Sequence, residues 1–213
     1  MKIYIVRHGQ SLGNASRVLL GSTTDLDLSE LGRLQAKATA EAMRDFPIDI
    51  IYTSDLKRAY STALPHAELH GVSVVPDKAF RECHLGAWEG KSADWCRENY
   101  PEEYPTVWGE GFGTFVFPEG ESTRGAGERV LKRVCEICRE NPDKNILIVS
   151  HAIALRSFFG VILNIAPEDV GRELPSITNA SYSVCEFDGE SFSVLEYSVD
   201  KHLEGIGITK LQA

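Results

Sequence analysis

The sequence predicts an α/β fold of three layers (α/β/α), with one mainly parallel sheet and helices on both of its faces. The first observation is an alternation along the chain, where strand-length runs rich in Ile, Val or Tyr are separated by helical patterns. Strands and helices that alternate in this way favour parallel pairing. The second observation is composition, because 213 residues with 43% hydrophobic and 25% charged side chains suit a single globular domain over residues 1–213.

Six strands are expected from the apolar runs. Two of them, Ser181–Phe187 and Ser191–Tyr197, flank Asp188-Gly189-Glu190, which is typical of a hairpin and is expected to extend one edge of the sheet. The other four runs are Lys2–Val6, Ile48–Tyr52, Val72–Val75 and Asn145–Val149.

Two amphipathic helices are expected between these strands. In the first, apolar residues recur at intervals of three and four from Leu28 to Ala42, and Ser29 is a suitable N-cap. In the second, an apolar stripe runs from Val130 to Cys138 and ends before Asn141-Pro142. Cys135 and Cys138 lie within this second stripe, so we expect them to pack in the core rather than form a redox pair.

The segment at about residues 88–121 does not follow this alternation. It is rich in Pro and Gly, and it carries an aromatic cluster. We interpret it as an insertion that covers the active face, with the aromatic rings over the cleft and in contact with a ring-bearing or apolar part of a ligand. The cluster consists of Trp108, Phe112, Phe115 and Phe117.

Charge and hydropathy exclude several classes of function. The 22 basic and 31 acidic residues give a formal charge of −9, which argues against a nucleic-acid partner or a polybasic membrane surface. No apolar run reaches the ~18 residues of a membrane helix, and the N-terminus lacks the apolar stretch of a secretion signal, so we expect a cytoplasmic protein. Five scattered Cys do not form a disulfide framework. Monomer and homodimer both remain open.

Two strands are followed by the same local pattern, a polar residue, a His and a small residue. Arg7-His8-Gly9 follows the first strand, and Ser150-His151-Ala152 follows the run that ends at Val149. The carboxyl ends of parallel strands lie at one edge of a sheet, where ligands bind in open α/β folds. Arg58 and Glu82 follow the two remaining parallel strands. We therefore expect two imidazoles, two guanidinium groups and a carboxylate to converge on one cleft.

This set suits the chemistry of a phosphate monoester. Arg7 and Arg58 offer forked, permanently charged groups that match phosphate oxygens, and His151 is expected to donate to the same oxygens. A neutral imidazole can attack phosphorus and carry the phosphoryl group covalently, which is the role we assign to His8. Glu82 is expected to protonate the leaving alkoxide and then to deprotonate water. Neither a metal ion nor a cofactor is expected, because these cations already supply the positive field.

The same residues resemble the histidine phosphatase superfamily, which has the phosphoglycerate-mutase-like fold. The resemblance runs from residue 3 to about residue 160, with the motifs in the same order. It implies a phosphohistidine on His8, a phosphate pocket of Arg7, Arg58 and His151, and Glu82 as proton donor. It also implies that Ser11 and Asn14 contact phosphate or substrate. The matching motifs are Arg7-His8-Gly9-Gln10-Ser11, Asn14, Leu28-Ser29-Glu30-Leu31-Gly32, the run 52–59, Arg81-Glu82, Gly86-Ala87-Trp88-Glu89-Gly90, the run 119–122 and Val149-Ser150-His151.

The superfamily contains both phosphatases and mutases, and the sequence favours hydrolysis. Cofactor-dependent mutases usually have Arg-His-Tyr-Gly after the acid, whereas this chain has Cys83-His84-Leu85-Gly86. The substrate is expected to be a small phosphorylated metabolite, such as a sugar phosphate, a phosphoglycerate or a nucleoside-phosphate-like ester. A phosphoglycerate mutase and a non-catalytic module that binds a phosphorylated ligand are the two alternatives.

Several other polar residues have simpler interpretations. Glu89 and Asp94 compete with Glu82 for the role of the acid, and Arg81 is expected to point outward or to support the reacting groups without touching the substrate. His66 and His70 are spaced as a metal-binding pair would be, but Pro65 precedes them, and we expect exposed positions on a helix.

Overall fold

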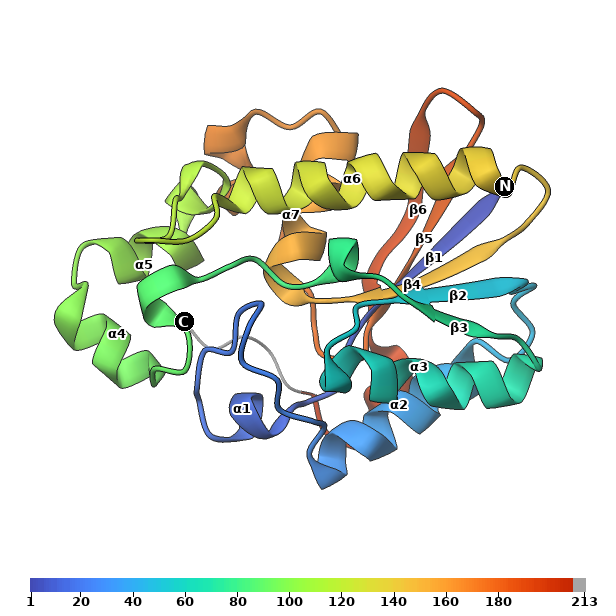
Figure 1. Cartoon of the computed structure of the whole chain (residues 1–213), viewed down its shortest axis with the longest axis horizontal. Coiled ribbons are helices and arrows are strands. Elements are labelled where there is room, and N and C mark those ends of the chain that lie inside the picture. Colours follow the sequence, from blue (N-terminus) through green and yellow to red (C-terminus); the bar gives the residue numbers. More distant parts are fainter. Residues whose placement is uncertain (209–213) are drawn as a thin grey trace.

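A computed structural model describes residues 1–208 as one six-stranded sheet covered by helices on both faces (Figure 1). The strand order is β3-β2-β4-β1-β5-β6. The neighbours among β1 to β4 pair in parallel, whereas β5 pairs antiparallel with β1 and with β6. The predicted mainly parallel sheet is therefore confirmed. The strands are β1 Lys2–Arg7, β2 Ile50–Thr53, β3 Val74–Pro76, β4 Ile146–Ser150, β5 Tyr182–Phe187 and β6 Phe192–Val199.

Eight α-helices are present in the described part of the chain. In Figure 1, α6 and α7 lie on one side of the sheet, and α2 and α3 lie on the other. The predicted N-cap Ser29 is confirmed, because its side chain accepts a hydrogen bond from the Gly32 amide at 3.0 Å. The helices are α1 Leu12–Ala15, α2 Glu30–Ala42, α3 Lys57–His70, α4 Ala93–Asn99, α5 Glu103–Trp108, α6 Thr123–Glu140, α7 Ala152–Ile162 and α8 Val170–Glu173.

Two hydrophobic cores fill the space between the layers. Alternate residues of a strand point to opposite faces of the sheet, so Ile3 and Ile5 of β1 join the core beneath α6 and α7, while Tyr4 and Val6 join the core beneath α2 and α3. All four side chains are buried. This double-sided burial explains why β1 and β4 appear in the sequence as continuous apolar runs rather than as alternating ones.

The segment at residues 88–121 forms short helices, and three of the four members of its aromatic cluster do not lie over the cleft as predicted. Phe112 and Phe117 are each 1% exposed and Phe115 is 8% exposed. The rings of Phe115 and Phe117 pack against Trp88, with centroids 5.8 and 5.4 Å from it. The three Phe rings therefore build the local core, because burying them removes more apolar surface from water than an open position over the cleft. Trp108 is the member of the cluster that lines the active-site cavity.

The prediction for His66 was wrong, since its side chain is fully buried and His70 is half-buried. Pro65 lies within α3 and does not end it. Arg58, Thr62 and His66 are four residues apart, so they share one buried face of this helix. In α6, Cys138 is buried in the core as predicted, and Cys135 is half-buried. None of the helices within residues 1–208 combines the length and apolarity needed to cross a membrane.

Candidate active site

The two histidines leave neighbouring strands at the same level of the sheet. In the parallel pair of β1 and β4, Arg7 lies opposite Ser150, so the next residue on each strand is a histidine at the sheet edge. The His8 amide donates to the Ser150 carbonyl at 3.0 Å. The two imidazole rings lie with centroids 5.0 Å apart and planes inclined at 60°. Both rings are buried, at 4% and 0% exposed.

The contacts of His8 leave its Nε2 atom with a lone pair. Nδ1 lies 2.6 Å from the Gly9 carbonyl oxygen, which can only accept a hydrogen bond, so the proton of the neutral ring is on Nδ1. Position 9 requires a glycine, since a Cβ atom there would lie 2.5 Å from the Gly32 carbonyl oxygen at the start of α2. The Gly9 amide donates to Thr62 Oγ1 at 3.0 Å, which fixes the backbone beside the ring.

His151 has the opposite arrangement. Arg58 Nε donates to His151 Nδ1 at 3.2 Å, and because a guanidinium group only donates, this Nδ1 carries the lone pair. The proton of the neutral ring is therefore on Nε2, a buried atom without a hydrogen-bond partner within residues 1–208. One ring thus presents a lone pair at the site, and the other presents an N–H donor.

Electrostatics keep both rings neutral. Burial, followed by the positive charges of Arg58 and Arg7, holds the pKa of His8 well below its usual value. Burial and the charge of Arg58 act in the same direction on the pKa of His151. Protonation would therefore have to occur well on the acid side of the ordinary histidine range, and the lone pair of His8 is present at neutral pH.

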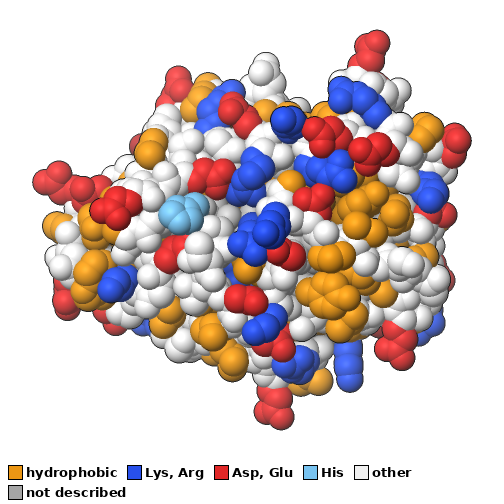
Figure 2. Space-filling model, in the orientation of Figure 1, with side chains coloured by type: hydrophobic (Ala, Val, Ile, Leu, Met, Phe, Trp, Pro, Cys, Tyr) orange, Lys and Arg blue, Asp and Glu red, His pale blue; other side chains and the backbone are white. Residues whose placement is uncertain are grey.

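The two guanidinium groups are held by main-chain carbonyls. Arg7 Nη1 donates to the Ile177 carbonyl at 2.5 Å. Arg58 Nη2 and Nη1 donate to the carbonyls of Gly21 and Thr24 at 2.7 and 3.1 Å. Burial lowers the pKa of both arginines to about 10, so both stay charged at neutral pH. On the face shown in Figure 2, basic and acidic side chains are interspersed. Both guanidinium groups are buried and line one cavity, where they supply positive charge.

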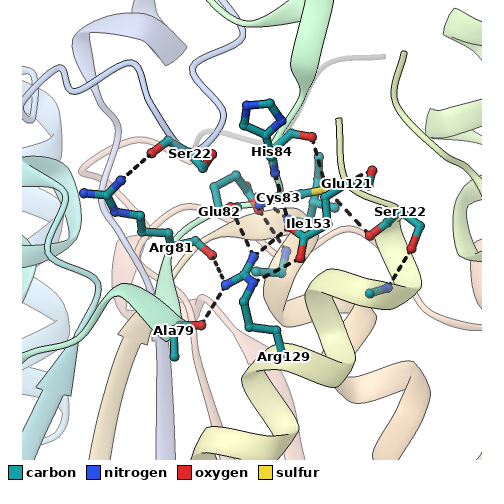
Figure 3. A network of polar contacts seen from close by, with 12 residues as sticks. Ser22, Ala79, Arg81, Glu82, Cys83, His84, Glu121, Ser122, Arg129 and Ile153 are labelled. Atoms are coloured by element: carbon teal, nitrogen blue, oxygen red, sulfur yellow. Dashed lines mark hydrogen bonds and ion pairs between the residues drawn. The ribbon is translucent and has the colours of Figure 1, made fainter. Parts of the chain in front are cut away.

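Glu82 lies at the N-terminus of α7, where free amides point at its carboxylate. Oε1 accepts from the Ala154 amide at 2.8 Å. Oε1 also accepts from the Cys83 amide at 2.9 Å, and Oε2 accepts from the Ile153 amide at 3.2 Å (Figure 3). The first turn of a helix has unpaired N–H groups and a positive dipole end, which suit a carboxylate. The group is 8% exposed and lines the same cavity as Arg7 and His8.

Arg129 of α6 holds the backbone on either side of Glu82, a role that the sequence did not reveal. Its Nη1 donates to the carbonyls of Ala79 and Arg81 at 2.7 and 3.0 Å, and its Nη2 donates to the Glu82 carbonyl at 3.3 Å (Figure 3). Nε and Nη2 of the same guanidinium donate to the two oxygens of the Glu121 carboxylate at 3.0 and 2.8 Å. This buttress fixes the chain that carries the Glu82 carboxyl.

The two competitors of Glu82 have other positions. The Glu89 carboxylate accepts from the backbone amides of Ser22, Thr23 and Leu85, at 2.9, 3.0 and 3.1 Å. It thereby orders the loop whose carbonyls hold Arg58. Asp94 is exposed and pairs with a neighbouring Arg on α4. The prediction for Arg81 is consistent with its contacts, since it pairs with Asp55 at 2.6 Å and donates to the Ser22 carbonyl.

Ser11 and Asn14 lie at different depths. Asn14 lines the cavity, whereas Ser11 is buried and caps α1, accepting from the Asn14 amide at 3.0 Å. A contact of Ser11 with a substrate stays a prediction. Asn179, which sequence reasoning missed, donates to the His8 carbonyl at 2.9 Å and to Asn14 Oδ1 at 3.3 Å. Its position just before β5, in an Asn-Ala-Ser turn, is a weak pattern that does not indicate this contact.

The cavity that these residues form has about 400 Å³ of space, including its open mouth. Arg7, His8, Arg58 and Glu82 line it, and His151 contacts Arg58 through the hydrogen bond to Nδ1. Residues 1–208 contain no group of three or more His, Cys, Asp or Glu side chains arranged to hold a metal ion. A reaction without a metal ion stays a prediction. Apart from Asn14 and Gly21, the remaining lining is apolar and consists of Val18, Leu19, Leu20, Leu85, Trp108 and Ile153.

Comparison with known proteins decides the family. A sequence model of the histidine phosphatase superfamily (branch 1) matches residues 3–200. The chain belongs to this superfamily. It is 31% identical over 204 residues to phosphoserine phosphatase 1 from Hydrogenobacter thermophilus, which covers 95% of this chain and 94% of the relative.

Solved structures of similar proteins have the same fold. YhfR from Bacillus stearothermophilus superposes with a TM-score of 0.87 at 27% identity, over 95% of this chain and 98% of that protein. A mycobacterial glucosyl-3-phosphoglycerate phosphatase, solved in complex with VO3, superposes with a TM-score of 0.83 at 27% identity, over 93% of this chain and 99% of that protein.

Proposed function

We propose that this histidine phosphatase hydrolyses small phosphomonoesters through a phosphohistidine on His8. The complementary pair of rings carries the proposal, since both rings are buried, and the Nε2 atom of His8 has a lone pair whereas that of His151 has a proton. Membership of the superfamily and the phosphatase names of relatives point to the same class of phosphoric monoester hydrolase. We further propose that the protein acts in the cytoplasm on a phosphorylated metabolite, without a metal ion, a cofactor or a nucleic-acid partner.

The proposed reaction has two displacements at phosphorus. In the first, His8 Nε2 attacks phosphorus, the bond from phosphorus to the ester oxygen breaks, and the Glu82 carboxyl gives that oxygen its proton. In the second, the Glu82 carboxylate takes a proton from water, the water oxygen attacks phosphorus, and the P–N bond breaks. Arg7, Arg58 and the His151 Nε2–H stabilise the charge on the three peripheral oxygens in both steps. Free phosphate, the alcohol, neutral His8 and protonated Glu82 result.

Hydrolysis is favoured over isomerisation by the side chains that come after the acid in the chain. Cys83 is fully buried in the core, and Leu85 forms part of the apolar wall of the cavity. Neither residue offers the guanidinium or phenol group that usually occupies these positions in the mutases. Water is therefore the expected acceptor of the phosphoryl group from the phosphoenzyme. The non-catalytic alternative is disfavoured because ligand binding alone needs neither the Nε2 lone pair of His8 nor a carboxyl held at a helix N-terminus.

The decisive experiment measures free phosphate and the phosphorylation of the enzyme together. Purified protein is given p-nitrophenyl phosphate and a panel of phosphorylated metabolites. The reaction is stopped with denaturant at alkaline pH, because a phosphohistidine hydrolyses in acid, and the enzyme is examined by mass spectrometry. We expect equal amounts of alcohol and free phosphate, with transient phosphorylation of His8 that the His8→Ala variant lacks. Conversion of 3-phosphoglycerate to its isomer without free phosphate would favour the mutase. Binding of phosphate with neither turnover nor label on His8 would favour the non-catalytic module.

A further inference from the structure

The first turn of α2 lies directly against the backbone that follows His8. A Cβ atom at Gly9 would lie 2.5 Å from the Gly32 carbonyl oxygen, and one at Gly32 would come closer still to the Gln10 carbonyl oxygen. Neither position has room for a side chain, so the two backbones approach each other because both residues are glycines. This contact gives a structural reason for the motif 28–32, which takes no part in the proposed reaction.

Gln35 uses this close approach to reach the chain beside His8. It lies three residues after Gly32, on the same buried face of α2, and its side chain is fully buried. Its Oε1 atom accepts a hydrogen bond from the Gln10 amide at 2.8 Å, and its Nε2 atom donates to the Gly207 carbonyl at 2.7 Å. An amide N–H only donates and a carbonyl only accepts, so these two partners fix which way the side-chain amide points.

The hydrogen bond to the Gln10 amide also sets the direction of the Gly9 carbonyl. Gly9 C=O and Gln10 N–H belong to one planar trans peptide group, so they point in opposite directions. Gln35 holds the N–H side of this group, and the carbonyl oxygen on the other side lies 2.6 Å from His8 Nδ1. Because glycine has no side chain to restrict its backbone, a turn of this peptide group would take the acceptor away from the His8 ring.

The peptide group before Gly9 is held separately. The Gly9 amide donates to Thr62 Oγ1 at 3.0 Å, and the His8 carbonyl accepts from the Ala180 amide at 3.2 Å. Loss of the Gln35 contact should therefore release the peptide group that carries the Gly9 oxygen, while the peptide group that joins His8 to Gly9 stays in place. The acceptor of the His8 proton thus depends on α2, and the backbone of His8 does not.

We propose that Gln35 is a positioning residue for the nucleophile. By holding the Gln10 amide it keeps the Gly9 carbonyl at His8 Nδ1, so the ring proton stays on Nδ1 and the lone pair stays on Nε2. Within residues 1–208 the lining of the active-site cavity does not include Gln35, so its effect passes through the peptide group alone. This assignment rests on the proposed function, because only an attacking Nε2 atom needs the lone pair.

The test compares Gln35→Met with Gln35→Glu in the full chain. Methionine fills a similar space without a strong acceptor for the Gln10 amide. In Gln35→Met the rate of His8 phosphorylation by p-nitrophenyl phosphate should fall about 10- to 100-fold, since a misplaced proton on a reacting histidine costs up to about 10⁴ in rate. A protonated glutamic acid offers one acceptor and one donor as the amide does, and burial favours this neutral form, so Gln35→Glu should keep most of the rate.

Two further readouts separate positioning from a merely structural role. ¹⁵N NMR of histidine-labelled protein should show the His8 proton on Nδ1 in wild type and in Gln35→Glu, but at least partly on Nε2 in Gln35→Met. The inhibition constant of inorganic phosphate reports on the anion pocket and should not change in either variant. Lys37→Met introduces the same side chain at an exposed position of α2 and is the matched control, which should equal wild type in all three measurements.

Gln35→Met overturns the assignment if the reaction keeps its rate, if the His8 proton stays on Nδ1, or if inhibition by phosphate weakens as much as the reaction slows. Should this variant fail to fold, hydrogen exchange of the wild-type protein decides instead. The Gln10 amide should then be as strongly protected as the amides of β1, and rapid exchange would overturn the assignment. If wild type neither hydrolyses p-nitrophenyl phosphate nor becomes labelled on His8, the proposed function itself fails, whereas NMR and hydrogen exchange still report on the Gln35 contact.

Discussion

The ends of β1 and β4 look alike in sequence, yet their histidines carry the proton on opposite nitrogen atoms. After β1 the partner of Nδ1 is a carbonyl oxygen, Gly9 O at 2.6 Å, and it requires a proton on Nδ1. After β4 the partner is a guanidinium, Arg58 Nε at 3.2 Å, and it requires a lone pair there. The same type of side chain therefore presents a lone pair at one strand end, where we propose a nucleophile, and an N–H group at the other, where we propose a hydrogen-bond donor. The second contact of the ring, not the ring itself, decides its role.

The largest effect is expected from removing the ring of His8, which we propose as the nucleophile. In His8→Ala no side chain can carry the phosphoryl group, so kcat should fall by about 10⁴–10⁶, as for other covalent nucleophiles. Stopped-flow or fixed-time phosphate release measures the loss, and the label on the protein should disappear with it. A variant with more than about a tenth of wild-type activity would show that His8 is not the nucleophile.

Removing the other ring is expected to cost less. His151→Ala deletes one preorganised donor, which typically costs about 10²–10³ in rate, while phosphorylation of His8 still occurs. His151→Gln offers an amide N–H in place of Nε2–H and should recover part of this loss. Single-turnover measurements of label on His8 separate the two variants. Equal rates for Ala and Gln would mean that the His151 proton does not contact the phosphate.

A change at Arg129 leaves both rings in place and affects the carboxyl group instead. In Arg129→Gln the backbone around Glu82 loses its three hydrogen bonds to the guanidinium, so proton delivery should weaken. We expect a loss of about 10-fold or more for alkyl phosphates, within the range of general acid catalysis. p-Nitrophenyl phosphate, whose leaving group needs little protonation, should lose far less. Equal losses for both substrates would indicate a merely structural role. Arg124→Gln, at an exposed position on the same helix, is the control.

His66 is a third buried histidine and differs from the other two, because neither of its ring nitrogens has a hydrogen-bond partner within residues 1–208. Burial lowers the pKa of His66 to about 3, so the folded protein disfavours its protonation. The contribution of this histidine to the free energy of unfolding is fully present above pH 6.5, its pKa in the unfolded chain, and it is lost as the pH falls toward 3. At pH 5 the free energy of unfolding has fallen by about 2 kcal/mol because of this group. Urea unfolding at pH 7 and pH 5 should show a smaller acid loss in His66→Leu than in wild type, with unchanged activity. An unaltered acid loss would contradict this account.

The smallest expected effect concerns His8 and His151, whose rings should not titrate near neutral pH. ¹⁵N NMR of histidine-labelled protein should show the proton of His8 on Nδ1 and that of His151 on Nε2. Because both pKa values are lowered well below the usual value, neither ring should gain a proton between about pH 7.5 and pH 6. Half-buried His70 serves as a less buried reference ring in the same spectrum. A midpoint near pH 6.5 for either active-site ring would contradict the assigned neutral state.

Much of the fold and of the site was predictable because it depends on periodicity. The apolar runs located all six strands to within two residues of their observed limits, and the polar residues that end β1 and β4 pointed to one edge of the sheet. Prediction was wrong where burial depended on what packs from elsewhere in the chain. Phe115 and Phe117 look like cleft aromatics until Trp88 is placed beneath them, and His66 looks exposed until the buried face of α3 is known.

The sequence by itself determined which side chains reach the active edge, because strand alternation and strand ends are encoded within a few neighbouring residues. The tertiary structure decided what each of them can do there. Arg58 and His151 are 93 residues apart in the chain, and the Glu82 carboxylate meets the Ala154 amide across 72 residues. Proton positions and carboxylate orientation depend on such distant hydrogen-bond partners, and no local pattern specifies them.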